Sequence, residues 1–199
     1  MPQPSFVVRA MAASRSKRRK SPALKAKMMI QRFLGHHTVH GVLEFLLMLA
    51  ILYFLFTGVV TLVLRTDSYW MGVTSQSMLH KDDYSWRQYY IDRGIDTSKF
   101  PIQGGFERGD LIIVQGIGSF SEVKIGDVVV LDQGSGVIPL VHRVVSIWDE
   151  NGSARFMTKG DANTSSLSSE ISNRPEQIIG KVILVIPKLG YISLWFQGR

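Results

Sequence analysis

A single apolar run near the N-terminus constrains this chain more than any other feature. Residues 42–64 carry one charge, Glu44, and from residue 45 onward the run has no charge at all. A helix of that uncharged length spans roughly 30 Å, the thickness of the hydrocarbon core of a bilayer. A surface helix of a soluble domain would show a polar face at 3.6-residue spacing, and this run shows none. The sequence therefore predicts a transmembrane helix over residues 41–64.

The charge is distributed unevenly on the two sides of this run. Residues 1–40 hold nine of the 23 Lys and Arg residues and no Asp or Glu, whereas the rest of the chain has more acidic than basic side chains. The positive-inside rule places such a tail in the cytoplasm and residues 65–199 outside, as a single-pass protein of the cell membrane. The Pro, Ser and charge content of the tail predicts disorder over residues 1–40. Because the basicity belongs to the tail, a nucleic-acid-binding domain is not expected.

The segment that follows, residues 65–199, is long enough for one domain with its own core. The chain has no cysteine, which excludes disulfides, thiolate metal sites and a cysteine nucleophile. Neither a metal site nor an organic cofactor is expected.

Short runs rich in Val and Ile, separated by turn residues, characterise this domain. Asn151-Gly152 is a strong hairpin signal, because both positions of such a turn need a positive φ. The pattern predicts a mainly β domain, an antiparallel barrel or sandwich. Residues 79–105 form an atypical polar and aromatic insertion that fits a short helix, a lid or a membrane-touching loop. The expected strands are residues 111–114, 127–131, 137–147, 154–158 and 178–186.

Three groups of side chains carry possible chemistry. A serine attacks a carbonyl carbon only when a base removes its proton, and a histidine suits that task near neutral pH. Ser77 and His142 are such a pair, although His142 also fits the core of a strand. Asp161 fits either an acid that orients the histidine or a turn residue. Lys159 is a competing base.

Several motifs follow one another along the chain. They are Ser75-Gln76-Ser77-Met78, residues 106–111, 125–129, 141–144 and 158–163, and the closing stretches 180–182 and 187–190. Together and behind an anchor, they resemble the type I signal peptidases, specifically the archaeal and endoplasmic-reticulum branch. Bacterial members carry a lysine as the base, whereas this chain has His142 at that position, as in the Ser–His branch.

The resemblance implies a serine endopeptidase of the membrane surface that cleaves signal peptides from exported preproteins. It implies Ser77 as nucleophile, His142 as general base and Asp161 as acid, with the Ser75 hydroxyl and the Ser77 N–H stabilising the oxyanion. The expected partners are preproteins, membrane lipid and, beyond these, translocation machinery or other subunits.

The chain departs from the family pattern at two motif positions. Leu79 replaces the usual proline two residues after the nucleophile, and Leu167 replaces a second aspartate six residues after Asp161. Glu170, the nearest later acid, is therefore the alternative third residue. The same departures leave a second hypothesis, an inactive membrane-anchored β module that binds a partner in a secretion complex.

Overall fold

The computed structural model describes residues 22–34, 37–82, 84–196 and 198. The chain divides into two compact units, Met1–Phe54 and Leu55–Arg199, and helix α2 (His37–Leu64) runs from the first into the second. Its stretch Val39–Leu64 is long and apolar enough to cross a membrane. None of the residues in the most apolar part of this stretch is buried by the rest of the described protein. The helix thus extends the predicted one by a turn at its start.

Helix α1 (Pro22–Leu34) differs from the predicted disorder of the tail. Its residues are mostly good helix formers, and Pro22 occupies the first helical position, where its missing N–H has no cost. Residues 1–21 and 35–36 of the predicted tail lie outside the described residues. In α1, a high positive charge and a good local helix propensity coexist.

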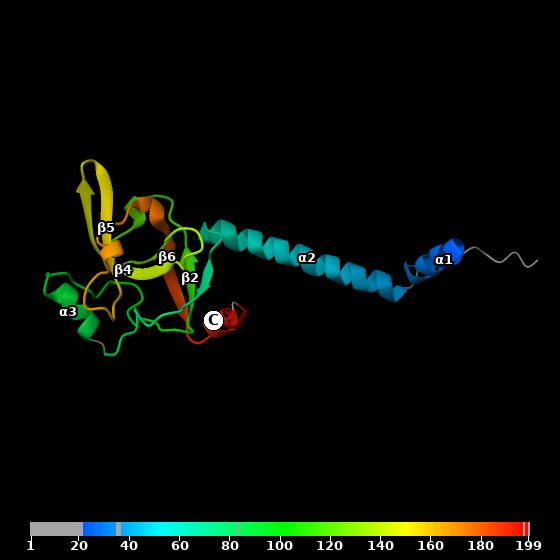
Figure 1. The fold of residues 1–199 in the computed structure, drawn as a ribbon, viewed down its shortest axis with the longest axis horizontal. Helices are drawn as coiled ribbons and strands as arrows, with labels where there is room; N and C mark the ends of the chain where they lie inside the picture. Colours follow the sequence, from blue (N-terminus) through cyan, green and yellow to red (C-terminus); the bar gives the residue numbers. More distant parts are fainter. Residues whose placement is uncertain (1–21, 35–36, 83, 197, 199) are drawn as a thin grey trace, which may run out of the picture. The chain divides into compact units, whose positions relative to one another are not determined.

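The second unit contains one six-stranded antiparallel sheet with the order β1-β2-β6-β3-β4-β5. The prediction of a mainly β, antiparallel domain is confirmed (Figure 1). The sequence did not decide between a barrel and a sandwich. In the structure the strands form a single sheet with β1 and β5 at its edges. The strands are β1 (Trp70–Gly72), β2 (Leu111–Gln115), β3 (Val128–Leu131), β4 (Leu140–Glu150), β5 (Ser153–Lys159) and β6 (Ile178–Ile186).

Apolar side chains cover both faces of this sheet. In β3, Val128 and Val130 belong to one core cluster, while Val129 and Leu131 belong to another. Successive side chains of a strand point to opposite faces, so a strand buried on both sides reads as a continuous apolar run. His142 lies directly opposite Val129 in the register of β3 and β4, well inside the domain.

The predicted hairpin turn at Asn151-Gly152 is confirmed. Asn151 has φ 55° and Gly152 has φ 81°, and the two residues join β4 to β5. The shorter helical elements are α3 (Ser85–Ile91), α4 (Gly190–Phe196) and the 3₁₀ turns Phe120–Glu122, Ser168–Glu170 and Pro175–Gln177.

The insertion at residues 79–105 contains helix α3, one of the possibilities that the sequence left open. Trp86 and Tyr90 of this helix are buried and form a third core cluster with Val145 of β4. The insertion therefore packs on the strand that carries His142.

Candidate active site

The serine motif follows edge strand β1 and ends in a turn. The hydroxyls of Ser75 and Ser77 lie 3.1 Å apart, with Ser75 exposed and Ser77 half-buried. The next residue, Met78, is 1% exposed and belongs to the main core cluster. Burial of Met78 fixes the backbone next to Ser77, while the Ser77 hydroxyl stays accessible.

His142 is buried in β4 with one ring nitrogen paired and the other unpaired. Its Nδ1 donates to Glu170 Oε1, and among the described residues its Nε2 has no hydrogen-bond partner. An ionised carboxylate only accepts hydrogen bonds, so Nδ1 carries the proton and Nε2 presents its lone pair. This is the tautomer that a general base at Nε2 requires.

Glu170 is a fully buried carboxylate that several donors hold in place. Its side chain accepts from the Thr158 hydroxyl at 2.9 Å and from the Leu167 N–H at 2.9 Å, in addition to His142. Burial by itself raises the pKa of the Glu170 carboxyl. The hydrogen bond from His142, with those from the two other donors, outweighs burial and holds this pKa below its usual value.

Gly160 brings the serine segment and the histidine together. A Cβ at Gly160 would lie 2.8 Å from the carbonyl oxygen of Ser77 and 2.9 Å from His142 Nε2. The Ser77 carbonyl also accepts a hydrogen bond from the N–H of Ala162 at 2.9 Å. The unpaired nitrogen of His142 and the backbone of Ser77 therefore border the same small space.

Asp161, the preferred acid in the sequence interpretation, does not contact His142. Its carboxylate is instead bound by the guanidinium of Arg143, at 2.7–3.1 Å, and by His80 Nε2, at 2.7 Å. The carboxylate that contacts His142 in the structure is that of Glu170, the alternative acid. The reason is that Asp161 follows β5 and turns toward Arg143, whereas the 3₁₀ turn Ser168–Glu170 returns to His142.

Lys159, the competing base, is occupied elsewhere. Its ammonium donates to the carbonyls of Gly160 and Asn163, at 2.9 and 2.8 Å, and lies 5.2 Å from the ring centroid of Tyr89. Burial lowers the pKa of this amine. The contacts tie Lys159 to the backbone of the loop after β5.

His80 is a buried titratable residue that sequence reasoning did not single out. It lies three positions after Ser77, inside the atypical insertion, and contacts Asp161 across 81 residues of sequence. A histidine this close to a candidate nucleophile was the available signal. Within the described part of the chain, no group of three His, Asp or Glu residues is arranged to hold a metal ion.

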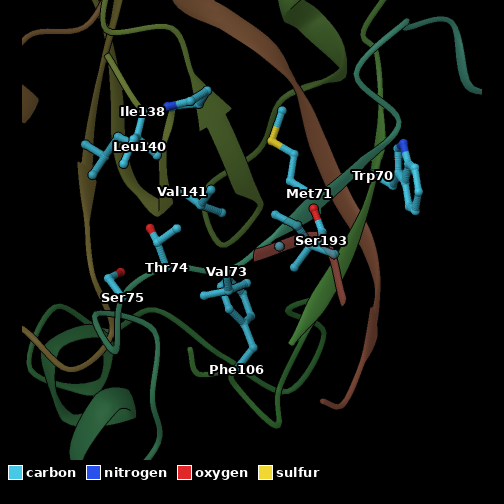
Figure 2. A pocket seen from close by; sticks show the side chains of 13 residues that line it. Trp70, Met71, Val73, Thr74, Ser75, Phe106, Ile138, Leu140, Val141 and Ser193 are labelled. Carbon is cyan, nitrogen blue, oxygen red and sulfur yellow. The ribbon is translucent and has the colours of Figure 1, made fainter. Parts of the chain in front are cut away.

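An apolar groove leads to the serine motif. It has a volume of about 360 Å³, and Figure 2 shows Ile138 and Leu140 of its lining at the left and Met71 and Trp70 at the right. Val141 lies between these two sides, and Ser75 and Phe106 line the lower part of the view. The groove runs along β1, which is an edge strand whose outer backbone groups are unpaired in the sheet.

The two buried carboxyls imply that stability depends on pH. Burial raises the pKa of Asp161, but the bonds from His80 and Arg143 outweigh it, so its pKa, like that of Glu170, lies below the usual value. A carboxyl with a lower pKa in the folded state stabilises the fold above its unfolded pKa, about 4, and loses that effect as the pH falls through its folded pKa.

We therefore expect the unfolding temperature to decline as the pH is lowered from about 5 toward 2. Thermal unfolding followed by circular dichroism measures this dependence. The Glu170→Gln chain, which lacks one of the two groups, is expected to show a shallower decline. An unfolding temperature that is constant across this range would contradict the argument.

Several known proteins are similar in sequence to about half of this chain. No family model matches the chain. The chain is 33% identical over 99 residues to the signal peptidase complex catalytic subunit SEC11 of Verticillium alfalfae, covering 47% of this chain and 57% of that protein. It is 34% identical over 103 residues to SEC11 of Saccharomyces cerevisiae, covering 48% of this chain and 60% of that protein. The chain thus spans somewhat more than half the length of the curated relatives it matches. The predicted resemblance to signal peptidases is confirmed over about half of the chain's length, where the proteins that it matches are named as signal peptidase complex catalytic subunits.

Proposed function

We propose that this protein is a membrane-anchored serine endopeptidase that removes signal peptides from exported preproteins. The observation that carries the proposal is the arrangement at His142. Its Nε2 is unpaired and lies beside the backbone of Ser77, while its Nδ1 is held by the buried carboxylate of Glu170. The similarity to signal peptidase catalytic subunits adds the substrate class.

In the proposed reaction, the Ser77 hydroxyl attacks the carbonyl carbon of the scissile bond. His142 Nε2 takes the serine proton and later gives it to the amine that leaves. Glu170 keeps the imidazole in the required tautomer and stabilises its charged form. Water then hydrolyses the acyl-enzyme, with His142 again acting as the base.

Charge that develops on the substrate oxygen needs donors already in place. The Ser75 hydroxyl, 3.1 Å from the Ser77 hydroxyl, and the backbone N–H of Ser77 are our candidates. Ser75 is exposed and also lines the apolar groove, so a peptide in the groove meets this hydroxyl at the end next to the nucleophile.

The groove suits a short extended peptide. A substrate strand that pairs with the free edge of β1 would place alternate side chains into the groove. Its apolar lining and small volume favour small residues before the cut.

The substrates of such an enzyme are themselves membrane-embedded, and we propose that α2 anchors the protein beside them. The basic tail favours a cytoplasmic N-terminus and an extracytoplasmic site. Helix α4 adds exposed aromatic side chains, with Trp195 75% and Phe196 77% exposed, that suit the lipid interface. Because the relatives are named as subunits of a complex, we propose further subunits of such a complex as partners.

The proposal is tested with full-length protein in lipid vesicles and a membrane-inserted model preprotein. We expect one cut after a small residue, identified by product mass, and loss of that cut when the small residue is replaced by tryptophan. If folded, inserted protein does not cut the preprotein, the proposal fails for the chain by itself, and a partner-binding module becomes the better account.

Gly160 offers a second prediction. In the Gly160→Ala variant, the new methyl group would stand within 3.0 Å of the Ser77 carbonyl, of His142 Nε2 and of the Asn163 side-chain nitrogen. Relief of these contacts requires Ser77 and His142, as well as the Asn163 side chain, to shift relative to residue 160. A displacement of that size is expected to lower kcat by about 100-fold. Steady-state cleavage kinetics measure this effect.

The matched control for Gly160→Ala is Gly104→Ala. A Cβ at Gly104 meets no atom within 4 Å, and its backbone is outside the left-handed region. This variant is expected to keep kcat within about twofold, as surface substitutions usually have small effects. Equal kinetics for the two variants would contradict the proposed closeness of Ser77 and His142.

A further inference from the structure

We infer that His80, through Asp161, is a positioning residue that holds the nucleophile segment and the base strand in register. This inference rests on the proposed function. Asp161 lies between the two: it binds Arg143, the neighbour of His142 in β4, and it binds His80, three residues after Ser77. We call His80, Asp161 and Arg143 the clamp.

His80 is held on every side. Its Nε2 donates to Asp161 Oδ2 at 2.7 Å, and its Nδ1 lies 2.9 Å from the carbonyl oxygen of Gln103. Both ring nitrogens face acceptors, which only a doubly protonated ring satisfies. The ring also stacks on Trp86 of α3, with centroids 4.5 Å apart and planes 14° apart, and its side chain is 6% exposed.

The Arg143 side chain is also held by several hydrogen bonds. Besides Asp161, its guanidinium donates to the carbonyls of Pro101, Gly126 and Ile102, at 2.7 to 3.1 Å, so that both terminal nitrogens and Nε are used. Its side chain is fully buried. The guanidinium therefore has one position, and it fixes the Asp161 carboxylate relative to β4.

The clamp reaches the reacting groups through the backbone next to Asp161. The residue before it, Gly160, lies against His142 Nε2, and the residue after it, Ala162, donates to the Ser77 carbonyl. The Asp161 N–H itself faces the Met78 sulfur at 3.5 Å. Rotation of the Asp161 carboxylate away from its partners would shift these contacts, and hence the separation of Ser77 and His142.

A purely structural role is the alternative, because His80 also anchors the insertion through its stack on Trp86. Two substitutions separate the roles. His80→Gln keeps a donor at the distance of Nε2, which faces Asp161, whereas His80→Asn keeps a donor only at the distance of Nδ1, which faces Gln103. Both lose the ring stack on Trp86, and His80→Gln also loses the contact to Gln103, so the insertion is damaged at least as much in His80→Gln as in His80→Asn.

The experiment measures preprotein cleavage by the full-length chain and both variants in lipid vesicles. We expect His80→Asn to lower kcat by about 10- to 100-fold with KM within about threefold of wild type. His80→Gln is expected to keep kcat within about threefold, since the charged hydrogen bond survives. Equal losses in both variants, or no loss in either, would overturn the inference.

Hydrogen exchange of the peptides that contain Ser77 and residues 160–163 gives a readout independent of cleavage. His80→Asn should exchange faster there than wild type and His80→Gln should not. If wild type does not cleave and this exchange difference is present, the proposed function fails while the clamp stands. If the exchange is the same in all three chains, the clamp is wrong whatever the cleavage result.

Discussion

Replacement of Ser77 by alanine is expected to abolish cleavage, lowering kcat on the order of 10⁴- to 10⁶-fold while the protein stays folded. The Ser77 side chain is half-buried and its hydroxyl contacts that of Ser75, so the change removes the nucleophile and little packing. Single-turnover cleavage of the model preprotein measures the loss, and circular dichroism checks the fold.

Ser75→Ala is the matched control for this change. The two serines are two residues apart with their hydroxyls 3.1 Å from each other, yet only one of them is proposed to form the acyl-enzyme. Removal of one oxyanion donor typically costs about 10²- to 10³-fold in kcat. If Ser75→Ala were the more damaging of the two, the assignment of the nucleophile would be reversed.

Replacement of Glu170 by glutamine is expected to lower kcat by about 10⁴-fold. The glutamine amide can donate to His142 Nδ1 and thereby favour the tautomer with the proton on Nε2, which cannot accept the serine proton. The shape of the side chain is nearly unchanged. With its nitrogen at the position of Oε1, the amide faces both His142 Nδ1 and the Thr158 hydroxyl, and its oxygen still accepts from the Leu167 N–H. The pH–rate profile of kcat/KM measures the effect on the base.

Asp161→Asn separates the two acids. Asp161 is the only carboxylate bound to the buried Arg143 among the described ion pairs, so this change leaves a buried guanidinium without its counter-ion. Breaking a buried pair in this way costs about 3–5 kcal/mol in the free energy of unfolding. We therefore expect Asp161→Asn to lower the unfolding temperature strongly and Glu170→Gln to act mainly on kcat. The reverse pattern would restore Asp161 as the acid.

Much of the fold was predictable because its signals are local. Strand β6 has the bounds that its apolar run predicted, and the Asn-Gly turn between β4 and β5 follows from backbone sterics alone. Strand β1 was not predicted, since it has three residues, and its pairing with β2 is set by a segment some 40 residues away. Helix α3 was left open because Trp86 and Tyr90 find their partner, Val145, only in the folded domain.

The candidate site was predictable only in part. Ser77 and His142 stand in motifs that the sequence displays. Which carboxylate reaches His142, that of Asp161 or that of Glu170, depends instead on the path of the loop that follows β5. The path of this loop is set by the β-bridge between Phe156 and Asn173, whose backbone groups form two hydrogen bonds of 3.2 and 2.8 Å. The spacing of motifs along the sequence does not predict this pairing of two distant residues.

The most direct test of the account is labelling of the full-length protein with a serine-directed phosphonate probe, with the modified residue located by mass spectrometry. We expect a single adduct on Ser77 in wild type, and labelling at least about 100-fold slower in His142→Ala, because the hydroxyl then lacks its base. An adduct on Ser75, no adduct at all, or undiminished labelling of His142→Ala would contradict the central claim that Ser77 and His142 form a nucleophile–base pair.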